Sequence, residues 1–167
     1  MNEPMSFYDR WGREYHPAPG EEIHDRHGVY VFLIAKGHTL LSWQNYAPDL
    51  AELLGGKIDE GESIGDALHR EVLEESGLVL PDASPQNEYH QKNGVYHIQG
   101  TPPSYSIHHQ TYWVMDYEGT LPNPIGTAFT GPEGNRLQWV SLESLGSVRI
   151  TYPHARALHV IAPEYLP

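Results

Sequence analysis

Short runs of apolar residues, separated by polar turns, predict a domain of strands with two main helices. The apolar run over residues 29–35 predicts a buried strand. Lys36 and Gly37 predict a turn, and residues 39–43 predict a second strand, so the two strands form an early hairpin. From Gln44 onward, a loop is predicted to lead into the first helix.

The second half of the chain alternates polar loops with further apolar runs. Residues 107–117 are rich in aromatic side chains and predict the longest of the later strands. Pro153 suits the first turn of a closing helix. The predicted order is a loop over 81–93, strands over 95–98 and 107–117, a loop over 121–134, a strand over 137–140, a helical turn over 142–145 and a helix over 153–161.

The first predicted helix carries acidic residues on its apolar side. At about 100° per residue, Glu71, Glu74 and Glu75 fall within roughly a quarter-turn of one another. The same arc holds the apolar residues Ile64, Ala67, Leu68 and Leu78. A solvated acidic face would instead lie opposite the apolar stripe. The acids therefore extend the side of the helix that is expected to face the core.

Such a group of acids needs a compensating charge. Carboxylates at these spacings repel one another, and burying them is unfavourable unless a cation neutralises them. Oxygen ligands in a tight group suit Mg²⁺ or Mn²⁺. The alternative is a surface helix with spare glutamates. Gly55, Gly56 and Gly61 allow the backbone to approach a ligand closely, and Gly77 ends the helix, so the surroundings favour the metal.

Residues 56–78 resemble the signature of the Nudix hydrolases, G-x5-E-x7-R-E-U-x-E-E-x-G-U, in which U is a bulky aliphatic residue. Every fixed position is matched, by Gly56, Glu62, Arg70, Glu71, Glu74, Glu75 and Gly77, with Val72 and Leu78 at the aliphatic positions. The resemblance implies an α/β fold of the Nudix type, an α/β/α sandwich with a central mixed β-sheet. It also implies that the signature forms a loop, a helix and a second loop.

A metal site on this helix is a further implication of the resemblance. Glu71 and Glu75 are the expected principal ligands, because residues four apart lie on one helical face. Glu74 is expected as an auxiliary ligand or a catalytic base, and Glu71 as a catalytic residue as well as a ligand. The carbonyl of Gly55 is a further candidate ligand.

Other motif residues are expected to shape the site. Gly56, Glu62, Arg70 and Gly77 have structural roles in this interpretation, and Arg70 is expected to pair with Glu62 and order the loop. Contact of Arg70 with the substrate stays an alternative. Lys57 and Arg70 are candidate substrate-binding residues, since they would bring positive charge to a phosphate.

Two candidates lie outside the motif. Residues 131–142 resemble the loop and strand of MutT-type members, in which an acidic loop residue reaches the metal. Glu133 is therefore a candidate ligand or catalytic general base, and the alternative is an exposed glutamate in a turn. Arg156 is a candidate substrate-binding residue, and it stands where relatives that hydrolyse oxidised guanine nucleotides have an asparagine.

Composition restricts the class of protein. A chain of 167 residues suits one domain, predicted over 23–167, with residues 1–22 as an extension packed on it. The absence of cysteine excludes disulfides, thiolate nucleophiles and cysteine–zinc sites. A formal net charge of -12 argues against binding of nucleic acid. With no apolar signal core and no long apolar run, we expect no membrane association and a cytoplasmic location.

Eleven histidines raise the question of a zinc site. His108 and His109 are adjacent on a predicted strand, so their side chains point to opposite faces of the sheet. The two cannot both enter one ordinary metal site. Zinc is therefore disfavoured.

The activity implied by the resemblance is Mg²⁺-dependent hydrolysis of the pyrophosphate linkage in a nucleoside diphosphate linked to another group. The expected partner is a small-molecule nucleotide, with a nucleoside triphosphate favoured, and the expected state is a monomer or a homodimer. Dinucleoside polyphosphates and ADP-sugars are alternative substrates. The rival class is a non-catalytic Nudix module that senses a nucleotide.

Overall fold

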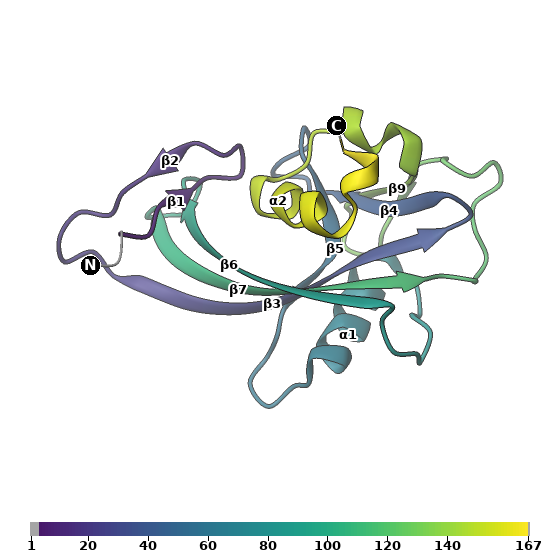
Figure 1. Ribbon diagram of the computed structural model, residues 1–167, viewed down its shortest axis with the longest axis horizontal. Coiled ribbons are helices and arrows are strands. Elements are labelled where there is room, and N and C mark those ends of the chain that lie inside the picture. The colour runs from purple at the N-terminus through teal and green to yellow at the C-terminus, as the bar shows by residue number, and fades with distance from the viewer. Residues whose placement is uncertain (1–3, 167) are drawn as a thin grey trace.

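The computed structural model of the protein describes residues 4–166, which form one nine-stranded mixed sheet with helices on both faces (Figure 1). The order across the sheet is β2-β1-β6-β7-β3-β5-β4-β9-β8. Its strands are β1 (Phe7–Tyr8), β2 (Glu14–Tyr15), β3 (Ile23–Ala35), β4 (His38–Trp43), β5 (Ala51–Lys57), β6 (Asn87–His97), β7 (Ser104–Asp116), β8 (Phe129–Thr130) and β9 (Arg136–Ser141). The helices are α1 (Ile64–Ser76), η1 (Leu142–Ser147), α2 (Tyr152–Ile161) and η2 (Pro163–Tyr165).

Two apolar cores lie on the two faces of the sheet. Successive residues of a strand point to opposite faces. Val31 of β3 therefore packs with Leu68 and Val72 of α1, whereas Phe32 packs with Leu158 of α2. Figure 1 shows α1 below the sheet and α2 above it. The predicted α/β/α sandwich with a central mixed sheet is confirmed.

The helices begin and end where the sequence signals predict. Ser63 caps α1, because its Oγ accepts a hydrogen bond from the amide of Asp66 at 3.1 Å. Gly77 ends α1 with a left-handed φ of 76°. Pro153 lies in the first turn of α2. Within residues 4–166, no helix is long and apolar enough to cross a bilayer.

Three strand predictions need correction. The loop predicted from Gln44 contains β5, and the loop predicted over 81–93 contains the first half of β6. β3 begins at Ile23, six residues before the predicted start at Val29. The missed segments are polar or rich in glycine. They form strands because neighbouring strands supply hydrogen-bond partners, and they carry no apolar pattern that would predict a strand. Local sequence is therefore a weak guide to them.

The N-terminal segment adds two short strands to the sheet. Phe7 of β1 pairs in parallel with Gly94 of β6, and β2 pairs with β1. The carboxylate of Asp9 is buried and accepts hydrogen bonds from the amides of Trp11 and Arg13. Residues 1–3 of the predicted extension, like residue 167, lie outside the described residues. The division at residue 22 stays a prediction.

The sheet splits beside β5, and α2 fills the gap. β5 pairs with β3 through residues 54–57 only. Before that point the amide of Leu53 donates to Nδ1 of His154 at 3.0 Å, and the amide of Ala51 donates to the carbonyl of Arg149. The segment that leads into α2 thus replaces a strand neighbour. The split therefore lies at the start of β5, and the end of β5, where the motif begins, is paired with β3.

Candidate active site

The two glycines at the end of β5 let α1 lie directly against the strand. A Cβ at Gly56 would be 2.5 Å from the carboxylate carbon of Glu71. Gly55 has a φ of 144°, and a Cβ there would be 2.6 Å from the Cα of Tyr30. The amide of Gly55 donates to Oε1 of Glu75 at 3.0 Å. The glycine pair therefore positions both glutamates of the helix.

Glu75 is the most buried acid of the motif, with 6% of its surface exposed. Burial raises the pKa of this carboxyl well above its usual range, against the hydrogen bond from Gly55. The neighbouring carboxylates of Glu52, Glu71 and Glu133 raise the same pKa further. The ionised form of Glu75 therefore lacks an adequate partner among the described residues. A cation would supply one.

Glu71 lies in a similar environment but has one cationic neighbour. Burial raises its pKa, the guanidinium of Arg70 opposes that change, and the charges of Glu74 and Glu133 add to it. Nη1 of Arg70 donates to Oε1 of Glu71 at 2.9 Å and to Oε2 of Glu74 at 3.2 Å. In this arrangement Arg70 partly neutralises the exposed end of the acidic group.

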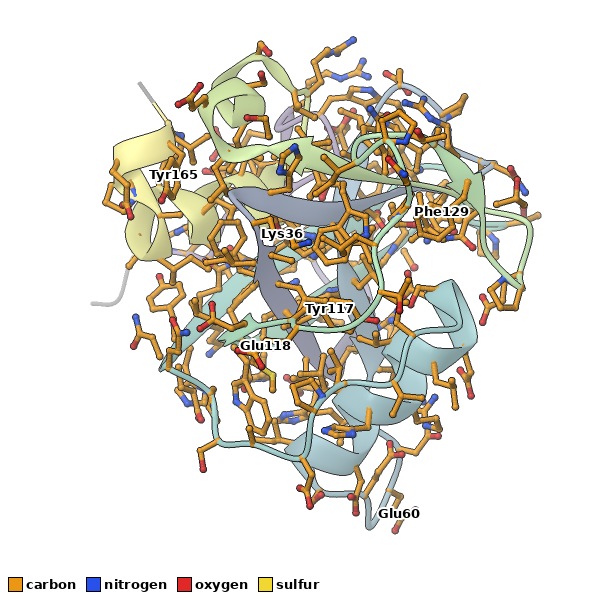
Figure 2. The ribbon with its side chains drawn as sticks, turned by 90° about the vertical axis from the view of Figure 1, so that its right-hand side faces the viewer. Lys36, Glu60, Tyr117, Glu118, Phe129 and Tyr165 are labelled. Atoms are coloured by element: carbon orange, nitrogen blue, oxygen red, sulfur yellow. The ribbon has the colours of Figure 1, made fainter. Side chains whose placement is uncertain are left out.

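Arg70 also ties α1 to the loop that precedes it. Its Nε and Nη2 donate to the two oxygens of Glu62 at 2.8 and 3.0 Å, and Nη2 donates to the carbonyl of Lys57. The paired guanidinium, together with the amide of Asp59, lowers the pKa of Glu62 to about 2. The expected Arg70–Glu62 pair is confirmed. Figure 2 shows Glu60 at the tip of this loop, pointing away from the molecule.

The residues fit a divalent cation in their chemistry more than in their present arrangement. Within residues 4–166, no group of three or more Asp, Glu, His or Cys side chains is arranged to hold a metal ion. Glu71 and Glu74 are turned toward Arg70. Nevertheless, the donors are hard oxygens with pKa values raised by burial, the type that Mg²⁺ and Mn²⁺ bind. Arg70 engages Oε1 of Glu71, and Oε2 is the oxygen that would be available to a cation.

Glu133 lies on the loop that packs against the end of α1. The backbone of Gly131 is so close to the carbonyl of Glu75 that a Cβ there would collide with it. Asn135 is buried and donates to Oγ of Ser42, which fixes the other end of the loop. The exposed Glu133 is near enough to raise the pKa values of the buried glutamates of α1. The loop thus brings the predicted fourth carboxylate to the acidic group.

Of the three predicted substrate-binding residues, Arg70 pairs with the carboxylates, and Lys57 and Arg156 form no ion pair with them within residues 4–166. The side chain of Lys57 is exposed, and its carbonyl accepts from Arg70. Arg156 lies on α2, across the sheet from α1, where it donates to Oδ1 of Asn93 and lies 5.9 Å from the ring centre of Tyr152. Asn93 belongs to β6, which β7 and β3 separate from β5. Arg156 is therefore remote from the acidic group.

Glu52 is an acid of this region that the sequence interpretation missed. It precedes Gly55 by three residues on β5, and burial raises its pKa, against the charges of Arg10 and Arg26. Its own charge raises the pKa of Glu75. The available signal was a single acid within the apolar run of residues 51–54, which the predicted loop concealed.

The two adjacent histidines of β7 lie in different environments, as predicted. His108 is buried, and burial lowers its pKa to about 3. His109 lies on the opposite face, with Nε2 2.9 Å from Oδ1 of Asp25. The two imidazoles do not share a site.

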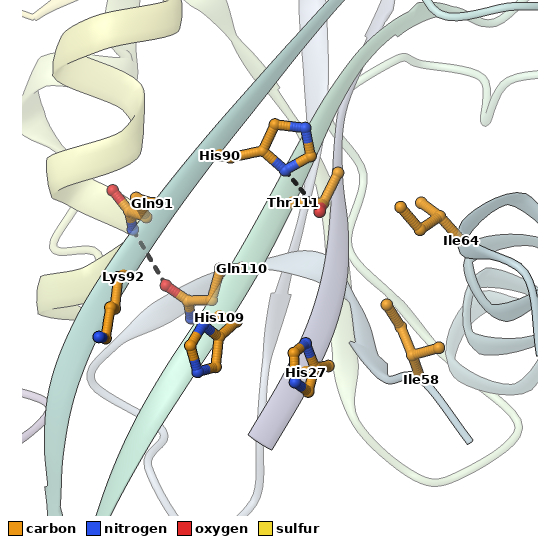
Figure 3. A pocket seen from close by; sticks show the side chains of 9 residues that line it. All are labelled: His27, Ile58, Ile64, His90, Gln91, Lys92, His109, Gln110 and Thr111. Atoms are coloured by element: carbon orange, nitrogen blue, oxygen red, sulfur yellow. Dashed lines mark hydrogen bonds between the residues drawn. The ribbon is translucent and has the colours of Figure 1, made fainter. Parts of the chain in front are cut away.

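A cavity of about 550 Å³ opens on the α1 side of the sheet (Figure 3). Figure 3 shows Ile58 and Ile64 on one side of it, opposite the histidines of β3, β6 and β7. None of the motif glutamates lines it. This cavity is therefore a neighbour of the acidic group and not the place where the carboxylates meet. Its lining includes His27, His90, His109, Lys92, Ile58 and Ile64.

Comparison with known families gives one match over most of the chain. A family model described as NUDIX domain matches residues 24–160. The comparison with curated proteins found no significant match.

Solved structures share the fold at low sequence identity. The MutT NUDIX hydrolase of Burkholderia pseudomallei is 21% identical with a TM-score of 0.58, over 81% of this chain and 97% of that one. The dihydroneopterin triphosphate pyrophosphohydrolase of E. coli is 15% identical with a TM-score of 0.57, over 86% and 99%. A bifunctional NMN adenylyltransferase/ADP ribose pyrophosphatase of Francisella tularensis is 20% identical with a TM-score of 0.59, over 89% of this chain and 43% of that one.

Proposed function

The chain belongs to the NUDIX family of hydrolases, and on that premise we propose that it cleaves, with Mg²⁺ or Mn²⁺, the pyrophosphate linkage of a nucleoside diphosphate linked to another group. The observation that carries the proposal is the placement of Glu71 and Glu75 against the glycine pair of β5. Both carboxylates are held close to backbone, and burial raises the pKa of both. Acids in this state are suited to binding a cation.

The proposed ligands are Glu71, Glu75 and the carbonyl of Gly55, with Glu74 and Glu133 as further candidates. A bound divalent ion supplies neutralisation of phosphate charge and a lower pKa for bound water. Arg70 holds the loop through Glu62, and Glu71 would be one of the residues that hold the ion. These residues hold and orient the phosphates, so the proposed chemistry needs no covalent nucleophile from the protein.

A catalytic base is needed to take a proton from the attacking water. Glu74 and Glu133 are the candidates, and their present partners differ. Oε2 of Glu74 accepts from Arg70, whereas Glu133 forms no ion pair within the described part of the chain. Its loop position also faces the acids that would hold the ion. These observations favour Glu133 as the base and Glu74 as an auxiliary ligand.

A nucleoside triphosphate remains the favoured substrate. Among the similar structures, one is a dihydroneopterin triphosphate pyrophosphohydrolase, which agrees with a triphosphate, and another is a bifunctional NMN adenylyltransferase/ADP ribose pyrophosphatase. Dinucleoside polyphosphates and ADP-sugars stay alternatives. Lys57 and Arg70 are proposed to contact substrate phosphates at the acidic group. The cytoplasmic location and the monomeric or homodimeric state remain predictions.

A panel of nucleotides tests the proposal. With Mg²⁺ present, we expect at least one nucleoside triphosphate, dinucleoside polyphosphate or ADP-sugar to be hydrolysed, and chromatography of the products identifies the bond cleaved. Glu75→Gln should reduce kcat/KM by about 100-fold or more. Glu118→Gln is the matched control, because Glu118 is exposed two residues after the C-terminal end of β7 and lies outside the acidic group (Figure 2).

The rival interpretation predicts a different pattern. A nucleotide-sensing module would bind members of the same panel without turnover, with either metal. Binding without product in the wild-type protein would therefore reject the enzymatic proposal. Equal activity of Glu75→Gln and the wild-type protein would reject the assigned metal site.

A further inference from the structure

A second polar region lies on the opposite side of the sheet from α1. Arg26 of β3 is on the same strand face as Tyr30 and Phe32, which α2 covers. Its register partner on β7 is His108, whose own partner on β6 is Asn93. The polar residues thus form a row across three strands, beyond the apolar core beneath α2.

Two arginines of this region have buried nitrogens without partners. Nη1 of Arg10 and Nε of Arg26 are inaccessible to solvent and form no hydrogen bond. Neither arginine forms an ion pair within residues 4–166, whereas Arg13, Arg70 and Arg149 each lie within 4.0 Å of a carboxylate. A buried N–H without an acceptor is unfavourable. Such a group is expected where a ligand supplies the missing acceptor.

Both arginines lie on the α2 side of the sheet although they are far apart in the chain, because the carbonyl of Arg10 accepts from the amide of Tyr152 at the start of α2 and Arg26 lies on the face of β3 that α2 covers. Burial lowers the pKa of His97, and the charges of Arg26 and Arg10 lower it further. The same two charges act on the half-buried carboxyl of Glu52. Arg10 lies 4.9 Å from the ring centre of Tyr46. Stacking uses the face of a guanidinium and leaves its N–H groups free to donate in the plane.

This region adjoins the acidic group of the candidate active site. Burial raises the pKa of Tyr30 to about 12, and the charges of Arg26, Glu52 and Glu75 all act on its hydroxyl. A Cβ at Gly28 would lie 3.2 Å from both the Tyr30 hydroxyl and the carbonyl of Gly56. The hydroxyl of Tyr30 therefore lies beside Gly28 and the carbonyl of Gly56, and Arg26 is the next residue along β3 beyond Gly28 on the same face.

We propose, resting on the proposed function, that Arg10 and Arg26 bind a phosphate group of the substrate that lies beyond the cleaved linkage. The acids would engage the pyrophosphate through the metal, and the arginines would engage a further anionic group directly. The substrate class is then a nucleotide with a phosphate in addition to the two of the cleaved linkage. Arg10 comes from the segment between β1 and β2, so this segment contributes to specificity.

Binding without metal tests the inference apart from catalysis. In EDTA, inorganic triphosphate should bind the wild-type protein in a calorimetric titration. Arg10→Gln and Arg26→Gln should each weaken that binding by about 10-fold or more. Arg149→Gln, at an exposed arginine paired with Asp49, should change it less than about 2-fold. Absence of binding to the wild-type protein, or equal weakening by the control, would overturn the inference.

Kinetics then identify which part of the substrate the arginines contact. With Arg26→Gln, KM for a nucleoside triphosphate should rise by about 10-fold or more, and KM for the same nucleoside diphosphate linked to a neutral sugar should change less than about 2-fold. If the rise in KM depends on the identity of the base and not on the number of phosphates, the arginines recognise the base and the inference is overturned. If the wild-type protein hydrolyses neither substrate, the proposed function fails, while triphosphate binding still decides the role of the arginines.

A stability measurement excludes a purely structural role. Replacing Arg26, whose inaccessible Nε has no acceptor, as in Arg26→Met, should leave the melting temperature unchanged or raise it. The increase in melting temperature that inorganic triphosphate gives the wild-type protein should be lost. A large fall in the melting temperature of Arg26→Met, together with unchanged triphosphate binding in Arg10→Gln, would overturn the inference.

Discussion

The carboxylate of Glu71 lies so close to Gly56 that residue 56 has no room for a Cβ. A Cβ added there would lie 2.5 Å from the carboxylate carbon and 2.6 Å from Oε2. The atoms in the way belong to the end of a flexible side chain, not to backbone. The absence of a side chain at residue 56 thus determines where a proposed metal ligand lies.

Gly56→Ala should therefore affect metal binding more than stability. The carboxylate of Glu71 can rotate away, so we expect the free energy of unfolding to fall by about 1 kcal/mol or less. The displaced ligand should weaken Mn²⁺ binding by about 10- to 100-fold. Urea denaturation in EDTA and a calorimetric Mn²⁺ titration measure the two effects. Wild-type affinity for Mn²⁺ would contradict the proposed role of Glu71.

Gly55→Ala should have the opposite balance. The backbone of Gly55 has a φ of 144°, and the added Cβ would meet the backbone of β3 at the Cα of Tyr30. Backbone cannot move aside as a side chain can, so we expect the free energy of unfolding to fall by about 3 kcal/mol or more. Urea denaturation checks this.

Gly20→Ala separates backbone strain from collision. Gly20 also has a positive φ, 86°, but nothing lies within 4 Å of an added Cβ. Strain alone should cost about 1 to 2 kcal/mol. Equal losses for Gly55→Ala and Gly20→Ala would mean that the contact with β3 does not constrain residue 55.

The motif helix is the part of the site that the sequence predicts best. Ser63, Gly77 and the acidic arc are local signals, and a helix of 3.6 residues per turn converts their spacing into geometry. The Arg70–Glu62 pair follows from the same short segment. The opposed environments of His108 and His109 follow from strand alternation.

Residues joined through the sheet could not be predicted in this way. Glu52 belongs to β5, whose sequence does not alternate between apolar and polar residues. At Glu52 this strand pairs with β4 on one side only, because its pairing with β3 begins at residue 54. Arg10 lies on the α2 side of the sheet because Phe7 pairs with Gly94 and the carbonyl of Arg10 accepts from Tyr152. No local pattern encodes a contact between segments that distant. Arg156, which stands where some relatives have an asparagine, lies on α2 away from the acids, and its contact with substrate stays a prediction.

Glu75→Gln should stabilise the metal-free protein at pH 7. Burial raises the pKa of Glu75 in the folded state above the ordinary 4.5, so the folded state binds the extra proton more tightly than the unfolded state. The penalty of the ionised carboxylate is absent below pH 4.5 and develops as pH rises through the folded pKa. We expect the variant to be more stable by on the order of 1 to 3 kcal/mol at pH 7.

Urea denaturation in EDTA at several pH values measures this difference, which should vanish near pH 4.5. Mg²⁺ at about 100 times its dissociation constant should then stabilise the wild-type protein by about 2.7 kcal/mol and leave Glu75→Gln nearly unchanged. Equal stabilisation of both proteins by Mg²⁺ would place the cation elsewhere.

His154 and His108 should make the protein sensitive to mild acid. Burial lowers the pKa of each to about 3, from an ordinary value of 6.5. The unfolded state therefore binds protons at a pH where the folded state does not, so stability is full above pH 6.5 and decreases as pH falls from 6.5 toward 3. The amide of Leu53 donates to Nδ1 of His154, which explains why the neutral ring is kept.

His154→Gln tests this, because a glutamine oxygen can accept from Leu53 but does not titrate. Melting temperatures are measured between pH 7 and pH 5 in a Glu75→Gln background, where the opposing titration of Glu75 is absent. We expect the fall in melting temperature to be smaller in His154→Gln than in its parent, and smallest when His108→Gln is added. His109→Gln, at the imidazole beside Asp25 on the other face, is the control and should follow the parent. If the melting temperature of His154→Gln falls as much as that of the parent, the acid sensitivity does not arise beneath α2, and protonation of exposed histidines would account for it.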